Sequence, residues 1–267
     1  MKKFDDIISK YDYYDTHTHI NSFPLIEKID EIIDNCKKNK VMMNAIGTNI
    51  QDSIEAVNQA KKYENVFATV GIHPAYVNIN TIESDFHSLE ELLKNNNGEI
   101  VAIGEVGLDY KYNKDTKEIQ ILFLKKFFDL GRKYHLPIEL HICCAHDDAI
   151  KFLKQNGHGL KLILHCYNAT IEQTKQYIDM GCYFSFSGMV TFKKKVNEII
   201  AAVNMIDINH IIIETDCPYL SPEPIRGTEN VPINVIHIFK KIAMIKDINE
   251  EDLKNILRNN ALSIFGK

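Results

Sequence analysis

The chain has 267 residues, of which 45% are hydrophobic and 25% are charged, so it is long enough to bury a full core. Its net charge of −5 excludes a general basic surface for nucleic acid, so a polyanionic substrate would need local groups or bound cations. The six cysteines form no C-x-x-C pair, and the N-terminus lacks an apolar signal-peptide region, so we expect a cytoplasmic protein. No apolar run approaches the length of a membrane span, and we expect no membrane contact.

Short β-branched or aromatic runs alternate with longer segments of helical period along the chain. The predicted strands cover residues 13–20, 41–48, 66–73, 100–106, 137–144, 160–167, 182–190 and 210–216. The predicted helices between them cover residues 24–39, 51–63, 86–93, 116–134, 147–155, 170–180 and 194–203. After the last strand, a proline-rich loop over 218–232 precedes two extra helices over 233–244 and 250–264. Without a composition break or a Gly/Ser linker, we expect a single domain over residues 1–267.

The alternation predicts a particular α/β fold. Strands of a parallel sheet are buried on both faces, and these runs are continuously hydrophobic, as that burial requires. Eight strand–helix units over roughly 250 residues are typical of a (β/α)8 TIM barrel. The alternative is a doubly wound open sheet, but no Gly-x-Gly-x-x-Gly turn follows the first strand. We therefore predict a TIM barrel with extra C-terminal helices.

Imidazoles and carboxylates lie toward the C-terminal ends of six predicted strands. His17 and His19 share one face of the first strand, because side chains alternate with a period of two. The other polar residues at strand ends are His73, Glu105, Glu139, His141, His165, Glu214 and Asp216. Taken singly, each is explained as well by a structural hydrogen bond or a helix cap. Together they would meet at one barrel mouth, where uncompensated buried carboxylates would be costly, so we predict a metal site.

The ligand set predicts two metal ions. Four imidazoles and two carboxylates exceed what one zinc ion needs, and the mixture of nitrogen and oxygen donors suits Zn, Mn, Fe or Mg. Centres of this kind use one bridging carboxylate and catalyse hydrolysis of phosphate esters, carboxylic esters or amides.

The strand-end motifs resemble those of the TatD-like metal-dependent deoxyribonucleases of the amidohydrolase superfamily. The resemblance extends from Asp15 to about Phe265. Its motifs are Asp15-Thr16-His17-Thr18-His19, Gly71-Ile72-His73-Pro74, Ile103-Gly104-Glu105-Val106-Gly107-Leu108-Asp109, Leu136-Pro137 through His141, His165-Cys166-Tyr167, and Glu214-Thr215-Asp216-Cys217-Pro218-Tyr219-Leu220.

The resemblance implies two ligand sets and a DNA substrate. One metal would be held by His17, His19, Glu105 and Asp216. The second would be held by Glu105 as the bridge, with His141 and His165. The family cleaves phosphodiester bonds in DNA, often from the 3′ end of single strands, so a 3′–5′ exonuclease or an endonuclease is expected. Mg²⁺ is the usual activating ion, with Zn²⁺ or Mn²⁺ as alternatives.

The resemblance also assigns catalytic and substrate-binding residues. Asp216 is the candidate general base, Glu105 the catalytic bridge, and His73 a pocket histidine that contacts a phosphate or a water. Arg226 is a candidate phosphate ligand in the loop after the last strand. One departure is Cys143, which stands where the family often has an arginine, so a contact to a phosphate of the scissile strand is expected to be weaker here.

Residues near the mouth add further expectations. Tyr110 and Tyr167 are placed to stack on bases. Glu214 shares parity with Asp216 and would accept a hydrogen bond from a ligand histidine one layer below the site.

Other functions stay open from sequence. One is an esterase, for example one that removes a D-amino acid from tRNA. Dihydroorotase-like and phosphotriesterase-like enzymes often bridge their metals with a modified lysine on the fourth strand, where this chain offers Glu105. A barrel without catalysis, used as a scaffold, is the non-enzymatic alternative. We expect a monomer with no obligate protein partner.

Overall fold

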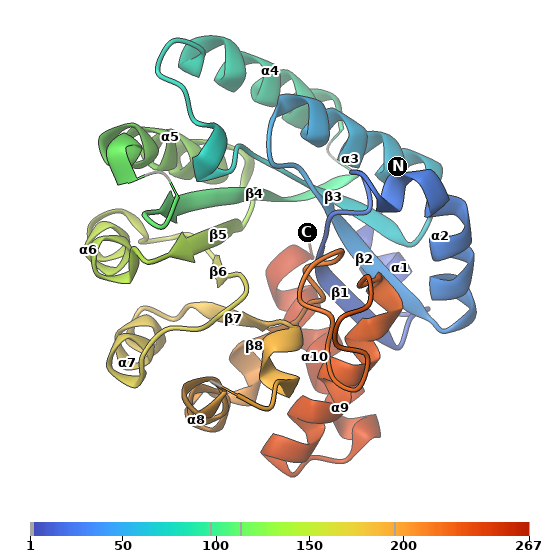
Figure 1. Cartoon of the computed structure of the whole chain (residues 1–267). Coiled ribbons are helices and arrows are strands. Elements are labelled where there is room, and N and C mark those ends of the chain that lie inside the picture. The colour runs from blue at the N-terminus through green and yellow to red at the C-terminus, as the bar shows by residue number, and fades with distance from the viewer. Residues whose placement is uncertain (1–2, 97, 113, 195, 267) are drawn as a thin grey trace.

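The computed structural model describes residues 3–96, 98–112, 114–194 and 196–266. Its eight strands form one parallel sheet in the order β1 to β8, and the helices lie around it (Figure 1). This confirms the predicted (β/α)8 barrel, since a doubly wound sheet would reverse its strand order. The strands are β1 (Tyr13–Thr18), β2 (Val41–Ile46), β3 (Val66–Val70), β4 (Ile100–Asp109), β5 (Ile138–Cys143), β6 (Leu162–Leu164), β7 (Tyr183–Phe186) and β8 (Ile211–Ile213).

Helices connect successive strands, and two more follow β8, as predicted. The connecting helices are α2 (Ile29–Lys38), α3 (Ile50–Lys62), α4 (Ile82–Asn95), α5 (Lys117–Tyr134), α6 (His146–Asn156), α7 (Ile171–Asp179) and α8 (Asn197–Met205). The closing helices are α9 (Val235–Lys246) and α10 (Glu250–Phe265). A short helix that the sequence did not predict, α1 (Phe4–Ile8), precedes β1. Residue 195, within the predicted helix 194–203, lies outside the described residues. No helix in the described ranges is long and apolar enough to cross a membrane.

An apolar cluster fills the N-terminal end of the barrel. The ring of Phe4 lies 5.1 Å from that of Phe67, 5.4 Å from that of Tyr14 and 5.8 Å from that of Phe265. Because α1 and α10 supply two of these rings, they cover this end of the barrel with buried aromatic surface. The loops that follow the strands lie at the opposite end, which this cluster leaves open.

Seven of the eight predicted strands are longer than the observed ones, and the difference is largest for β6, β7 and β8, whereas β4 is longer than predicted. β6, β7 and β8 end soon after their apolar centres, and the backbone then leaves the sheet. Cys166 and Asp216 have φ angles of +47° and +55°, which are left-handed values that L-residues other than Gly, Asn and Asp rarely adopt. A left-handed residue cannot continue the ladder, so the ends of β6 and β8 turn out of the sheet beside the candidate ligands.

The barrel closes between β1 and β8 through few backbone contacts. Thr18 forms an isolated bridge with Cys217, and the backbone N–H of Asp216 donates to the carbonyl of His17 at 3.1 Å. The buried carboxylate of Asp15 completes this closure, because it accepts the backbone N–H of Thr215 at 2.8 Å and its hydroxyl at 2.6 Å. We call this set of contacts the β1–β8 seam.

Asp15→Ala should destabilise the fold by about 2–4 kcal/mol, because it leaves two buried donors of Thr215 without an acceptor. Urea unfolding measures the change. Asp15→Asn keeps one acceptor oxygen and should lose less. Asp34→Ala, on the exposed face of α2, is the matched control and should stay within about 0.5 kcal/mol of the parent protein. Equal stability of Asp15→Ala and Asp34→Ala would contradict the role assigned to the seam.

Candidate metal centre

The structure brings all six predicted ligands together at the C-terminal end of the barrel. His17 and His19 come from β1 and the residue after it, Glu105 from β4, and His141 from β5. His165 comes directly after β6, and Asp216 is the third residue after β8. The side chain of His17 is fully buried, whereas Asp216 and His141 reach solvent. Strand ends that are far apart in sequence thus place nitrogen and oxygen donors at one point, as the sequence predicted.

Four donor atoms converge on one side of the centre. The Nε2 atoms of His17 and His19 are 3.3 Å apart. Asp216 Oδ1 lies 3.4 Å from His19 Nε2 and 3.8 Å from His17 Nε2. Glu105 Oε2 lies 3.7 Å from His17 Nε2. The donor atoms of His17, His19 and Glu105 lie within 4.8 Å of one another, with Asp216 beside the two imidazoles, and nitrogen–oxygen donor sets of this kind suit Zn, Mn and Fe.

The second oxygen of Glu105 points to a different group of imidazoles. Its Oε1 lies 2.7 Å from His141 Nδ1, 3.5 Å from His165 Nε2 and 3.7 Å from His73 Nε2. One carboxylate with its two oxygens facing two histidine groups has the shape that a bridging ligand needs. The division of the six ligands between two metals stays a prediction.

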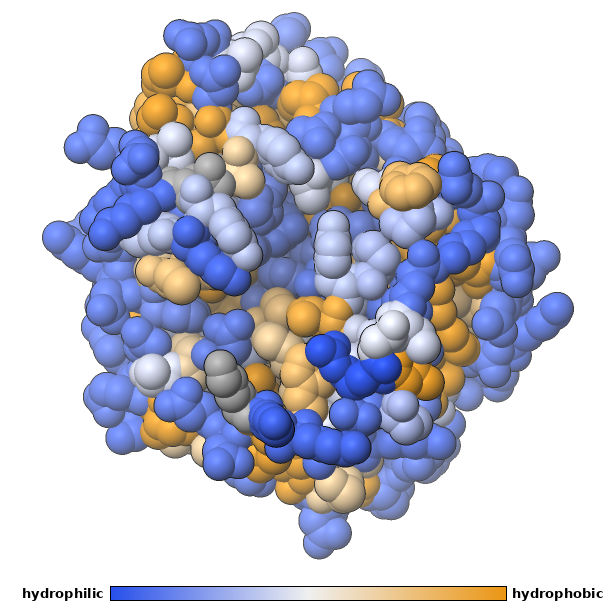
Figure 2. Space-filling view, in the orientation of Figure 1, coloured by the Kyte–Doolittle hydropathy of each residue, from blue (hydrophilic) through white to orange (hydrophobic). Residues whose placement is uncertain are grey.

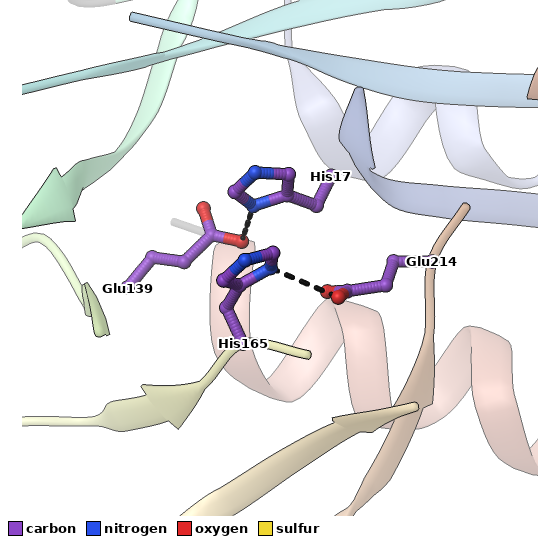
Figure 3. Close-up of side chains that lie close together, drawn as sticks. All are labelled: His17, Glu139, His165 and Glu214. Atoms are coloured by element: carbon purple, nitrogen blue, oxygen red, sulfur yellow. Dashed lines mark hydrogen bonds and ion pairs between the residues drawn. The ribbon is translucent and has the colours of Figure 1, made fainter. Parts of the chain in front are cut away.

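Two buried carboxylates lie on either side of the stacked His17 and His165 rings, and each contacts one of them (Figure 3). Glu139 Oε1 lies 2.9 Å from His17 Nδ1, and Glu214 Oε1 lies 2.9 Å from His165 Nδ1. The two imidazole rings stack with centroids 3.7 Å apart. A proton held on each Nδ1 leaves Nε2 as the metal-binding atom. The sequence assigned this role to Glu214; it missed it for Glu139, although Glu139 precedes His141 by two residues just as Glu214 precedes Asp216.

Sequence reasoning also missed Asp109. Its Oδ2 lies 3.2 Å from His141 Nε2, so this imidazole is held between Asp109 and Glu105. The shared parity of residues 105 and 109 on one strand could have indicated this placement. Gly107, between them, has a φ of +151°, and a Cβ there would lie 1.9 Å from the carbonyl oxygen of His141. Only glycine allows β4 and β5 to approach so closely at this point.

His73 lines the cleft with one nitrogen already occupied. Its Nδ1 accepts the backbone N–H of Ala75 at 3.0 Å. Burial lowers the pKa of His73 to about 4, so the ring is neutral near pH 7 and carries its proton on Nε2. His73 therefore offers a hydrogen-bond donor, beside Glu105, to whatever occupies the cleft.

Carboxylates of the centre raise the pKa values of His19, His141 and His165, whereas burial lowers the pKa values of His17 and His73. Burial raises the pKa of Glu105, but His73, His165 and His141 outweigh burial and hold that pKa well below its usual range. Burial lowers the pKa of His165, but Glu214 and Glu105 outweigh burial and raise it to about 10. A metal ligand nitrogen must be unprotonated, so a cation would displace the proton of a ligand imidazole whose pKa is raised.

The open cleft above the centre occupies about 720 Å³. Figure 2 shows this face of the molecule hollowed near its middle. The cleft is lined by His19, Ser22, Phe23, Thr48, Asn49, Asp52, His73, Ala75, Tyr76, Glu105, Asp109, Tyr112, His141, His165, Asp216, Pro218 and Tyr219. No lysine or arginine in the described part of the chain is among them.

Three residues predicted to contact substrate lie elsewhere. Tyr110 packs under the amine of Lys117, 5.4 Å from the ring centroid, in a separate depression beside α6. The guanidinium of Arg226 lies 4.0 Å from the ring centroid of Phe192 and donates to the carbonyl of Ser221, outside the cleft. The prediction that Tyr167 stacks on bases is wrong, because its ring is buried.

Comparison with known proteins agrees with this geometry. The family model described as TatD related DNase matches residues 14–266. The chain belongs to the TatD family. An uncharacterized metal-dependent hydrolase of Mycoplasma genitalium is 34% identical to it over 260 residues, covering 95% of this chain and 99% of that protein. The uncharacterized metal-dependent hydrolase YabD of Bacillus subtilis is 33% identical over 256 residues, covering 94% of this chain and 98% of that protein.

Solved structures of TatD proteins share the fold. The TatD homologue YjjV of Escherichia coli superimposes with a TM-score of 0.88 at 20% identity, over 95% of this chain and 98% of that one. A TatD family hydrolase of Entamoeba histolytica gives a TM-score of 0.85 at 23% identity, over 96% and 98%. This TatD chain is therefore a metal-dependent hydrolase, with a buried cluster of His, Glu and Asp able to bind metal.

Glu139→Ala should weaken metal binding about 10- to 100-fold, because the His17 ring loses the acceptor that fixes its Nδ1 proton. Titration of the metal-free protein with Zn²⁺ against a competing chelator measures this. Glu139→Gln retains an acceptor oxygen and should lose less. Glu31→Ala, exposed on α2, is the matched control and should bind as the parent does. Unchanged affinity in Glu139→Ala would show that Glu139 does not orient His17.

Metal binding by the TatD chain should release protons at pH 7. His165 has a pKa of about 10 without a cation and is protonated there, so its Nε2 must lose a proton to become a ligand. The affinity should therefore fall as the pH is lowered. Calorimetric titration with Mn²⁺ in two buffers of different ionisation enthalpy measures the protons released. Equal heats in the two buffers would contradict this assignment.

Proposed function

We propose that this TatD protein is a divalent-metal-dependent deoxyribonuclease that hydrolyses phosphodiester bonds of DNA. The observation that carries the proposal is the position of Glu105, whose two oxygens face two separate groups of imidazoles. Support also comes from the family description, which names a DNase, and from relatives named metal-dependent hydrolases.

The donor set supports two cations with Glu105 between them. His17, His19, Asp216 and Glu105 would hold one cation, and His141, His165 and Glu105 the other. Cations bound there supply Lewis-acid chemistry, lowering the pKa of a water and neutralising charge on phosphate oxygens. We propose Mg²⁺ as the functional ion, with Zn²⁺ or Mn²⁺ as alternatives. Every proposed ligand comes from one chain, so a monomer suffices for the site.

Side chains of the protein accept the proton of the water and bind the phosphate. Asp216 reaches the cleft through a carboxylate that is partly exposed, so it can accept the proton of an attacking water. His73 presents its Nε2 proton to the cleft and can donate to a phosphate oxygen of the substrate. No basic side chain in the described ranges lines the cleft, so the positive charge facing the scissile phosphate would come from cations held by these ligands.

The nuclease assay uses end-labelled single-stranded and duplex DNA with Mg²⁺, with Mn²⁺ or with EDTA. Cleavage should require the cation. Glu105→Ala and Asp216→Asn should each reduce it at least about 100-fold, because one removes the bridge and the other the base. Glu31→Ala is the matched carboxylate control and should cleave as the parent does. Labels at the 3′ and 5′ ends report the polarity of cleavage.

Two results would overturn the proposal. If no DNA is cleaved with either cation while the ester of a D-aminoacyl-tRNA is hydrolysed, the site serves an esterase. If instead the protein hydrolyses neither substrate, and elemental analysis finds no metal in the purified protein, the scaffold alternative is favoured.

A further inference from the structure

Exposed aromatic rings surround the cleft. The side chains of Phe23, Tyr76, Tyr112 and Tyr219 are 74%, 59%, 72% and 62% exposed. They are the exposed phenylalanines and tyrosines of the described residues, and all four line the cleft. Large apolar rings are normally buried, so rings gathered around one opening indicate a binding surface.

Two of these rings, those of Tyr76 and Tyr219, each follow a residue of the centre by three positions and are held by the same kind of backbone turn. The backbone N–H of Tyr76 donates to the carbonyl of His73 at 2.8 Å, and that of Tyr219 donates to the carbonyl of Asp216 at 2.9 Å. The Tyr76 ring centroid lies 6.2 Å from that of His73, and the Tyr219 ring centroid lies 6.0 Å from that of His19. Each turn thus positions one tyrosine beside a histidine of the centre.

The remaining two rings extend this surface around the opening. Phe23 lies in the loop after β1 and Tyr112 in the loop after β4. With the tyrosines after β3 and β8, loops from four different strands present aromatic rings to one cleft. We call these four side chains the aromatic rim.

Charge does not explain how a polyanion would bind here. The cleft-lining charged residues in the described ranges are acidic or histidine, and the chain carries a net charge of −5. Beyond the phosphates that bound cations would contact, a DNA strand would meet the half-buried carboxylate of Asp52. Affinity for the rest of the strand must come from another source, and stacking of bases on aromatic rings supplies it without regard to sequence.

We propose that the aromatic rim binds the unpaired bases of single-stranded DNA that flank the scissile phosphate. The proposal rests on the proposed nuclease function and extends it. Bases within a duplex are stacked on one another and cannot lie on these rings, so the rim favours single strands and frayed ends. The amine of Lys111 lies 4.7 Å from the ring centroid of Tyr112, so this basic side chain stands at the rim and binding should keep a modest dependence on salt concentration.

Binding is measured by fluorescence anisotropy on Asp216→Asn protein with Mg²⁺, so that cleavage does not interfere. The probes are labelled oligothymidylate, an abasic strand of the same length and charge, and a duplex. Oligothymidylate should bind at least about ten-fold more tightly than the other two. Tyr76→Ala with Tyr219→Ala should remove this advantage and leave the abasic strand unaffected. A strand containing 2-aminopurine should lose fluorescence on binding the rim, as stacked bases do.

Matched variants separate stacking from other effects. Tyr76→Phe with Tyr219→Phe keeps both rings and should retain the preference. Met244→Ala removes an exposed apolar side chain on α9 and should change nothing. The altered side chains are exposed, and thermal unfolding checks that the variants fold. Equal binding of abasic and base-containing strands, tight duplex binding, or an unchanged preference in the double alanine variant would each overturn the proposal.

The result is also distinguishable from failure of the nuclease function. If the parent protein cleaves DNA and the rim variants do not change base preference, only the rim is refuted. If the parent cleaves no DNA but prefers strands with bases, the rim is supported as a binding surface and the nuclease is refuted. No detectable binding of oligothymidylate refutes the rim.

Discussion

The carboxylate of Glu105 is buried at the barrel mouth with imidazoles on both sides, and its charge must be balanced there. His17 faces one oxygen, while His141 and His165 face the other. Removing any of these groups leaves a charge in a region of low dielectric, which costs far more than the same loss at the surface. Protons balance the charge when no cation is bound, and cations can replace them. The ends of β1, β4, β5 and β6 must therefore stay in place relative to one another, because each carries a partner of this charge or the charge itself.

The interior of the barrel changes from apolar to polar along its axis, and this change makes the charge balance possible. At the N-terminal end, aromatic rings from α1, α10 and the first strands exclude water. One layer higher, Glu139 and Glu214 carry buried carboxylates whose partners are the ligand histidines. The ligands come next, and the open cleft follows. Each layer orients the one above it, so the geometry of the centre is set by residues that never meet substrate.

The fold and the ligands could be predicted because both depend on local patterns. Continuous hydrophobic runs alternating with helical segments indicate a parallel barrel, and polar residues at strand ends must then share one mouth. Glu139 and Asp109 were missed although each shares strand parity with a predicted ligand, as Glu214 does, because parity alone does not tell which of these carboxylates meets an imidazole of a neighbouring strand. The short strands and α1 were missed because left-handed residues and tertiary packing decide where they begin and end.

Loops limited the prediction of substrate contacts. Tyr110 and Tyr112 are two residues apart, yet only Tyr112 lines the cleft. Tyr110 comes directly after β4 and packs against Lys117. Asp109 Oδ1 accepts the backbone N–H groups of Lys111 and Tyr112, and the turn formed in this way places Tyr112 at the opening. Strand periodicity does not extend into such a turn. Arg226 lies outside the cleft, and its stacking on Phe192 likewise depends on contacts between loops that strand periodicity does not describe.

The β1–β8 seam also has a consequence for synthesis of the protein. Asp15 and Thr215 are separated by 200 residues, and the seam joins the strand that carries His17 and His19 to the one that precedes Asp216. A nascent chain therefore holds the two histidines long before their carboxylate partner leaves the ribosome. The centre forms only after about four-fifths of the polypeptide has emerged, so an unfinished chain has no complete hydrolytic site. The barrel closes and the ligand set becomes complete at the same stage of synthesis.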